Sequence, residues 1–382
     1  MKFLRALLTL VGVLVLLAIA GTVIFTHYLK GKYEKPIYEA RQLGASVVDN
    51  FCAEQTKLSR DPFFHVQRPS ADAAEVLNKW VAWENSPGHA LPPGSPLVIP
   101  AGLPQTNAEL KEWLTQPLDV SKLDFSWMKE LHKYDRWDIS NWPGRVPGKF
   151  DAMAMPLPWF VSFQAWAKYR LLDGIARKDP VSASRDVQQL AWLSYRTDTL
   201  IGGVIAATLL TFERAAYEAH PELHSLEWQP MTKDELTRFK NVLWASVSLQ
   251  HLAQSPAVAE KARSCGTPPV GACIGMAEAA VPASYMAPVI PKDLFGGVES
   301  LKKSVDSSGC TQLASTVLRD GKTISESGAD PSALMGPDAP AEGIIRRMPA
   351  AFTREAIGGI LIAISMPGGE KLAPFEADGG TP

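Results

Sequence analysis

Residues 159–219 read WFVSFQAWAKYRLLDGIARKDPVSASRDVQQLAWLSYRTDTLIGGVIAATLLTFERAAYEA. Apolar residues recur at helical spacing as far as Leu171, and they do so again from Val187 to Leu209. Asp179-Pro180 separates the two runs, and proline suits the first position of a helix. The stretch therefore predicts two long helices joined by a short turn, an αα-hairpin, with a bend in the second helix near residues 197–199.

Further helical signals flank this hairpin. Six prolines between residues 86 and 104 remove backbone donors and predict an extended connector. Asp124 begins a short helix that should end near Tyr134. Helix-start pairs with the spacing of a capping box occur at Asp72 with Glu75, Thr106 with Glu109, and Thr232 with Glu235. No stretch alternates with the period of a strand, so the fold is predicted to be mainly α.

The amino-terminal stretch from Leu7 to Phe25, LLTLVGVLVLLAIAGTVIF, carries no charge. At about 1.5 Å per residue it can cross most of a bilayer core of roughly 30 Å. We predict a transmembrane helix over residues 7–29, a signal anchor preceded by a basic tail at residues 1–6. Two alternatives stay open: a signal peptide cleaved after Ala20, and a buried core helix.

The charges on either side of this span favour neither orientation clearly. Lys2 and Arg5 precede the span, and Lys30, Lys32 and Lys35 follow it. A short tail before a large domain favours a cytoplasmic amino terminus, and the cysteines suit an oxidising exterior. We therefore predict a single-pass cell-membrane protein whose bulk is extracytoplasmic, in a periplasm.

The chain after the span is long enough for one large domain or two subdomains. The whole chain has 382 residues and a formal charge of −2. We expect a helical front subdomain at 30–150 with the connector at 86–104, a hairpin core at 151–254, and a Gly/Pro/Ser-rich part at 255–382 that ends in a helical pair. The chain downstream of residue 34 carries −5, because residues 1–34 hold four of the basic side chains and one acid. That balance excludes a nucleic-acid binder.

Four cysteines are present: Cys52, Cys265, Cys273 and Cys310. An even count in an extracytoplasmic chain predicts two disulfides, with three possible connectivities. We expect pairing within residues 265–310, because that weakly apolar segment gains most from a crosslink. Free buried thiols are the alternative, and the lack of a C-x-x-C pair argues against a zinc site.

The densest group of chemically versatile side chains lies in residues 124–142, DFSWMKELHKYDRWDISNW. Its carboxylates could act as general acid and base on a glycan, and its tryptophan rings could stack on sugars. The alternative is that these residues cap helices, pack, or face solvent. The catalytic candidates are Glu130, Asp135 and Asp138, and the binding candidates are Trp127, Trp137 and Trp142.

Other motifs are weaker. His220, Glu222 and His224 could ligate a metal, but Pro221 interrupts the helix that would align them. No phosphate-binding, dinucleotide-binding or nucleophile motif occurs in the sequence, so we predict no metal and no cofactor.

The sequence thus favours a membrane-anchored envelope protein of the binding, scaffold or assembly kind. Its expected partners are the lipid bilayer, through residues 7–29, and a protein or an envelope polymer. The alternative is a glycan hydrolase that uses the carboxylates within 124–138.

Overall fold

The computed structural model describes residues 49, 52–145, 150–151, 155–252, 271, 273–278, 280, 302, 305–306, 310 and 312–321. The predicted transmembrane helix, Cys265 and the expected C-terminal helical pair lie outside these residues. The described residues all belong to one of the chain's two compact units, Val48–Ile290 with Gly296–Asp330. Among them the regular elements are helices, and β-pairing is limited to isolated bridges, which confirms a mainly α fold.

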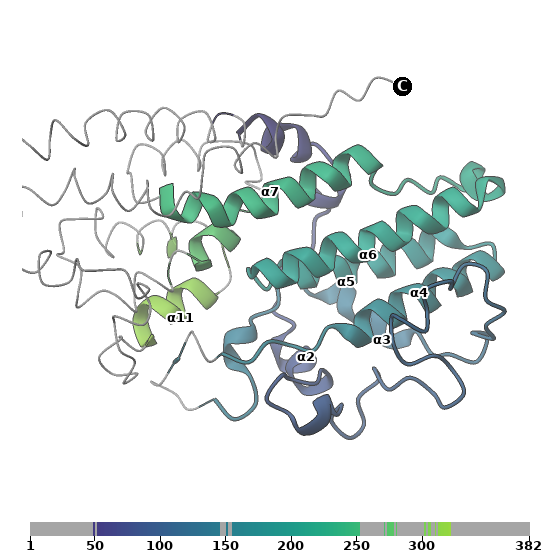
Figure 1. The fold of residues 1–382 in the computed structure, drawn as a ribbon, viewed down its shortest axis with the longest axis horizontal. Helices are drawn as coiled ribbons and strands as arrows, with labels where there is room; N and C mark the ends of the chain where they lie inside the picture. The colour runs from purple at the N-terminus through teal and green to yellow at the C-terminus, as the bar shows by residue number, and fades with distance from the viewer. Residues whose placement is uncertain are drawn as a thin grey trace, which may run out of the picture. The chain divides into compact units, whose positions relative to one another are not determined.

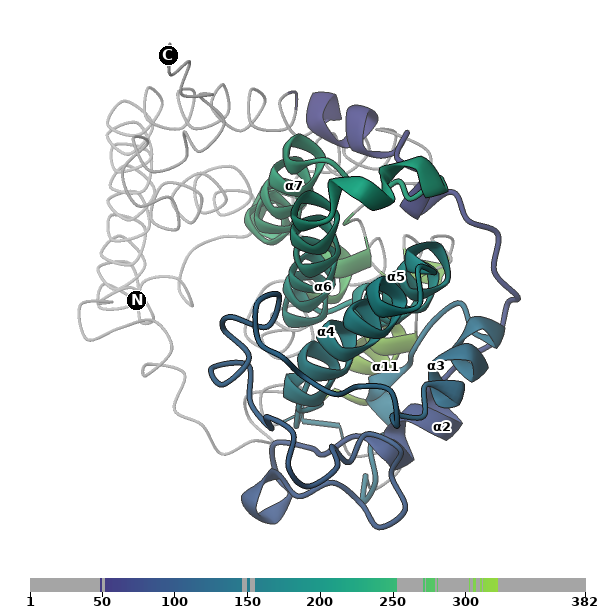
Figure 2. The same ribbon diagram turned by 90° about the vertical axis from the view of Figure 1, so that its right-hand side faces the viewer.

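Four long helices form the centre of this unit (Figure 1). They are α4 (Val161–Ala176), α5 (Pro180–Tyr195), α6 (Leu200–Ala219) and α7 (Lys233–Leu252). Helix α5 packs against α4 and α6, and α6 also packs against α4 and α7; Figure 2 views the same helices from the side.

The predicted break at Asp179-Pro180 is confirmed. Pro180 occupies the first turn of α5, and the Asp179 side chain accepts a hydrogen bond from the Ser182 amide. Gly174 makes the sharp turn possible, since a Cβ there would lie 2.4 Å from Cβ of Ala183. Small residues thus let α4 and α5 approach closely.

The second predicted helix is in fact two, so three consecutive helices replace the expected two-helix hairpin. Residues 196–199 separate α5 from α6, with Asp198 in the left-handed region at φ 57°. Thr199 caps α6 by accepting a hydrogen bond from the Gly202 amide. A Cβ on Gly202 would lie 2.2 Å from the Ser194 carbonyl oxygen, so only glycine fits this tight reversal.

Helix α6 is the long apolar helix of the bundle. Its 20 residues are long and apolar enough to cross one, and among the described residues no other helix is. Half of the apolar window is buried inside the protein, and the helix contains the fully buried Glu213. Its packing against three other helices is that of a central core helix.

The front part holds two short helices, α2 (Ala74–Trp80) and α3 (Ser126–Glu130). Both start beside a predicted capping acid: Asp72 accepts from the Ala74 amide at 2.9 Å, and Asp124 accepts from the Ser126 amide at 2.8 Å. The structure places the formal caps one residue later, at Ala73 and Phe125.

The helix predicted after Thr106 is wrong, although its capping box forms. The Thr106 amide donates to Glu109 Oε2 at 2.8 Å, but the residues that follow form turns. The backbone closes three-residue turns there instead, as from the Trp113 amide to the Leu110 carbonyl, while Lys168 Nζ also binds the carbonyl of Leu110 and the Gln116 side chain binds that of Glu109. The Thr232–Glu235 box, by contrast, does start a helix, α7.

Side chains of α4 hold the proline-rich connector against the bundle. Trp166 Nε1 donates to the Leu97 carbonyl at 2.9 Å, and the Tyr169 hydroxyl donates to the Pro104 carbonyl. Lys168 is almost fully buried, with its ammonium 4.5 Å from the Phe212 ring centroid. Burial lowers the pKa of Lys168 to about 8.

A second, smaller core lies around α11 (Gln312–Asp320). Its side chains are Phe150, Ala277, Ala280, Val305, Leu313, Ala314 and Val317, with Trp142 packed at the edge. Arg145 joins this core to the front part through an ion pair with Asp320 at 3.0 Å. The part of the chain beyond residue 270 thus contacts residues that lie far away in sequence.

Candidate functional site

One face of α5 holds the predicted site stretch. Three side chains of α5, spaced three residues apart, and the carbonyl of Arg196 just beyond the end of the helix each bind the segment from 131 to 137. Asp186 Oδ1 lies 2.9 Å from His132 Nε2, and the Gln189 side-chain amide donates to the carbonyls of Leu131 and Tyr134. Trp192 Nε1 donates to the carbonyl of Asp135. The carbonyl of Arg196 accepts from the Trp137 amide. The segment is therefore fixed at every turn of the helix.

The three candidate tryptophans pack against other side chains. Trp127 is buried edge-on against Trp166, and Trp137 is buried with its Nε1 donating to Asn78 Oδ1 at 2.7 Å. Trp142 is partly buried against Phe150. The faces of Trp127 and Trp137 are covered by neighbouring side chains, so a sugar ring approaching from solvent would not meet them.

The three candidate carboxylates have separate partners. Glu130 is exposed and pairs with Lys133, whereas Asp135 is partly buried, 3.6 Å from Arg196 Nη1. Asp138 is buried and caps a short 3-10 turn by accepting from the Ser140 amide. Burial raises the pKa of Asp138. Among the described contacts each carboxylate thus has a structural neighbour, and the glycan-hydrolase hypothesis stays a prediction.

The arrangement closest to a chemical site is one that the sequence did not indicate. Asp186, buried on α5, orients the half-exposed ring of His132 with one oxygen and accepts from Arg170 Nε at 2.7 Å with the other. Arg170 also donates to Asp173 at 3.1 Å and lies 5.4 Å from the Phe125 ring centroid. The contact with Asp186 fixes the orientation of the imidazole ring.

Asp186 could have been found only by noticing an acid on the inner face of a helix. Its neighbours Ala183, Val187 and Leu190 are all fully buried, so a solvated position was unavailable to it. The described side-chain contacts of His132 end at Asp186. The geometry therefore gives an anchored imidazole within a buried ion-pair network, without an adjacent nucleophile in the described residues.

A second buried acid lies between α5, α6 and the turn that precedes α7. Glu213 is fully buried and accepts hydrogen bonds from Ser184 Oγ, Gln188 Nε2 and Trp228 Nε1. These donors favour the carboxylate, but burial outweighs them and raises the pKa of Glu213 to about 7. Burial likewise raises the pKa of Asp61 to about 6. The carboxyl groups of Glu213 and Asp61 are thus protonated in mildly acidic solution.

The histidine-rich turn after α6 uses its polar atoms locally. His220 Nδ1 lies 2.9 Å from Glu222, and the His224 ring stacks on Tyr217 with centroids 3.7 Å apart. His224 Nε2 also bonds the Tyr217 carbonyl oxygen. The two histidines therefore have different neighbours, which is consistent with the interruption expected at Pro221.

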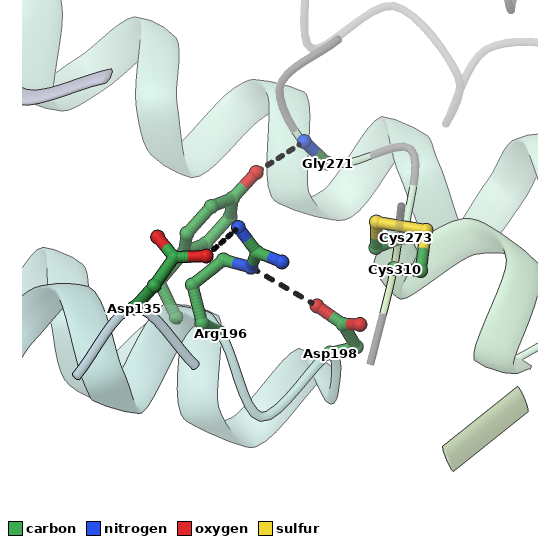
Figure 3. The surroundings of a disulfide bond; sticks show 7 residues. Asp135, Arg196, Asp198, Gly271, Cys273 and Cys310 are labelled. Carbon is green, nitrogen blue, oxygen red and sulfur yellow. Dashed lines mark hydrogen bonds and ion pairs between the residues drawn. A yellow bond between two sulfur atoms is a disulfide. The ribbon is translucent and has the colours of Figure 1, made fainter. Parts of the chain in front are cut away.

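A disulfide joins Cys273 to Cys310, within the segment where the sequence predicted a crosslink (Figure 3). Cys52 is also disulfide-bonded. Beside the Cys273–Cys310 bond, the Tyr195 hydroxyl accepts from the Gly271 amide at 2.8 Å, which ties this segment to the end of α5. Burial raises the pKa of Tyr195 to about 12.

Replacing Asp186 by asparagine should destabilise the protein far more than removing its histidine partner. D186N removes one of the two buried carboxylates at the Arg170 guanidinium and leaves Asp173 as the other, so the cost should approach the about 3–5 kcal/mol of breaking a buried pair on one side. His132→Ala loses a half-exposed contact and should cost about 1 kcal/mol or less. Chemical denaturation of both variants checks this. Equal losses would show that Arg170 does not depend on Asp186.

The free energy of unfolding should depend on pH through Glu213. Its pKa is about 7 in the folded chain and 4.5 as a model acid, so its contribution is fully present below pH 4.5 and is lost as the pH rises through 7. The loss amounts to roughly 3 kcal/mol. Glu213→Gln cannot ionise, so its stability relative to wild type should rise by that amount between pH 4.5 and 7.5. The exposed Glu75→Gln serves as control, and parallel profiles for E213Q and wild type would refute the assignment.

Comparison with known proteins gives no relative for this chain. No protein family, no curated protein and no solved structure matches it. The functional argument therefore uses this chain's own residues.

Proposed function

We propose that the chain is a membrane-anchored envelope protein whose helical domain lies outside the cytoplasm and binds a partner. The observation that carries the location is the Cys273–Cys310 disulfide, together with the bonded Cys52. Such bonds persist in oxidising compartments and are rare in the cytosol. The uncharged run within residues 7–29 would both export the domain and keep it at the bilayer.

A binding role is supported by how the polar groups are used. In segment 131–137 the His132 ring and three backbone carbonyls bind side chains of α5. The stretch richest in catalytic residue types therefore joins the front part to the bundle. Residues held in this way build a rigid surface. A rigid, pre-organised surface lowers the entropy cost of binding.

The surface that we assign to the partner contains Trp159. Its side chain is 37% exposed, and the ring stacks on His89 with centroids 4.0 Å apart. The Trp159 amide donates to the Ala82 carbonyl, which fixes the backbone beneath the ring. Exposed tryptophans held on rigid backbone are typical anchors of protein interfaces. The partner is therefore proposed to be a protein.

The location is tested by following the full chain in cells. We expect the protein in the washed membrane pellet, a C-terminal reporter that is active only outside the cytoplasm, and Cys273 and Cys310 protected from alkylation until reductant is added. Deleting residues 1–29 should leave the chain in the cytosolic fraction with free thiols. An uncleaved full-length chain in the soluble fraction, or a cytoplasmic C-terminus, would contradict the proposal.

The binding role is tested by photocrosslinking in intact cells. A photoreactive residue at position 159 should give a discrete adduct that protease removes, because the Trp159 side chain would lie in the interface. The same residue at the exposed Lys240 of α7 serves as control and should give none. An adduct removed by a cell-wall glycosidase instead would identify a polymer, and equal labelling at both positions would refute a specific surface.

A further inference from the structure

Lys168 on α4 is a buried lysine that lacks an acidic partner among the described residues. The residue is only 3% exposed. Its ammonium contacts neutral groups: Oδ1 of Asn107 at 2.5 Å, the carbonyl of Leu110 at 3.0 Å, and the rings of Phe212 and Trp113, whose centroids are 4.5 and 6.0 Å away. Lysine is rarely fully buried unless it is paired, so this side chain needs a chemical explanation.

The environment of this lysine favours the neutral amine. Burial without a compensating charge opposes the charged form and lowers the pKa of Lys168 to about 8. Near that pH a large fraction of the chains carries a neutral amine at position 168. A desolvated lysine amine with a lowered pKa is a nucleophile, whereas an ammonium is not. The burial of Lys168 thus prepares it for covalent chemistry.

The group in contact with this amine is a side-chain amide. Because the lysine ammonium only donates, the oxygen and not the nitrogen of Asn107 faces it. The amide carbon lies one bond, about 1.23 Å, behind that oxygen. The capping box around Asn107 holds the turn in place, since the Glu109 amide donates to Thr106 Oγ1 and the Thr106 amide donates to Glu109 Oε2. Two groups 61 residues apart in sequence are therefore kept in contact, and well-oriented groups reach effective concentrations of about 10⁵ M or more.

The two sides of this contact differ in their access to solvent. Lys168 is buried, whereas Asn107 is exposed. Among the described contacts the Asn107 side chain is bonded through its oxygen alone, so its nitrogen carries no hydrogen bond that would have to be broken. A nitrogen released from Asn107 can therefore leave as ammonia into water.

We propose that Lys168 and Asn107 form an intramolecular isopeptide bond, which fastens the turns after the proline-rich connector to α4. The product is a neutral amide, so the cost of burying a cation at this place disappears. The amide keeps one N–H, which continues to face the carbonyl of Leu110. The bond thus retains a hydrogen bond of the buried lysine and removes its charge.

The reaction balances without a co-reactant. The neutral Nζ of Lys168 attacks Cγ of Asn107, and the new bond joins these two atoms. The bond from Cγ to Nδ2 of Asn107 breaks, and Nδ2 leaves as ammonia with one proton that Nζ gives up. No atom is oxidised or reduced, and water serves only to carry the proton between the two nitrogens.

The experiment is mass spectrometry of the full chain after incubation at several pH values on either side of pH 8. We expect an intact mass that is lower than the sequence mass by one ammonia molecule. Trypsin should then release a branched peptide that joins residues 80–111 to residues 150–170, because a modified Lys168 is no longer cleaved. Below pH 8 the neutral fraction of Lys168 falls about tenfold per pH unit, so the rate of bond formation should fall in the same proportion.

The decisive variant is Asn107→Ala, because it removes the electrophile from an exposed position and leaves Lys168 in place. N107A should keep the full sequence mass and give no branched peptide. Lys168→Arg keeps a buried cation without a nucleophilic amine and should behave in the same way. Asn85→Ala, at another exposed asparagine, serves as control and should form the bond as the parent does.

Three results would overturn the proposal. The first is complete cleavage after Lys168 at every pH in the parent chain. The second is a linear peptide 80–111 that lacks one ammonia molecule, since that product is a succinimide at Asn107 and not a crosslink. The third is a branched peptide that persists in N107A.

Discussion

The structure depends on the inner face of α5. Its apolar side chains pack between α4 and α6, while Asp186, Gln189 and Trp192 extend to bind segment 131–137. Gln189 also accepts from Arg68 Nε, and the Arg68 guanidinium lies 4.0 Å from the Trp192 ring centroid. A segment with little regular structure of its own is thereby ordered by one rigid helix. Its backbone oxygens are satisfied by side chains, as buried carbonyls require.

Asp186 on α5 and Glu213 on α6 show two ways of burying an acid. Asp186 keeps a cation beside it, because Arg170 binds its second oxygen and is itself shared with Asp173. Glu213 has three neutral donors and no cation in its described contacts, so the cost of burying charge appears as a raised pKa. The first arrangement makes the fold sensitive to mutation. The second makes the stability of the fold sensitive to pH. Both acids lie on the neighbouring helices α5 and α6.

Structural features that depend on nearby residues could be predicted from the sequence, whereas features set by tertiary contacts could not. The start of α5 at Pro180, the Thr232–Glu235 cap and a crosslink within 265–310 each needed only local spacing, and each is present. The turns after Thr106, by contrast, include a contact with Lys168, whose ammonium binds the carbonyl of Leu110 across 58 residues of sequence. Asp186 was missed for a similar reason: its partners His132 and Arg170 come from different elements. The apolar periodicity of a sequence predicts which face of a helix is buried, but it does not predict which polar groups lie on that face.

The break at residues 196–199 is where local and distant constraints meet. One helix from Pro180 to Ala219 would satisfy the apolar period, but it would carry α6 away from α4, with which it packs. The reversal instead places Thr199 as a cap, uses Gly202 where a side chain would strike a carbonyl, and turns Asp198 inward. A buried acid at a left-handed position is an expensive way to reverse a chain, since asparagine or glycine would serve the backbone equally well. Arg196 Nε lies 3.9 Å from Asp198 Oδ1, so this buried carboxylate has a cation beside it. The reversal between α5 and α6 therefore depends both on the cap that Thr199 provides within the turn and on the charge that Arg196 places beside Asp198.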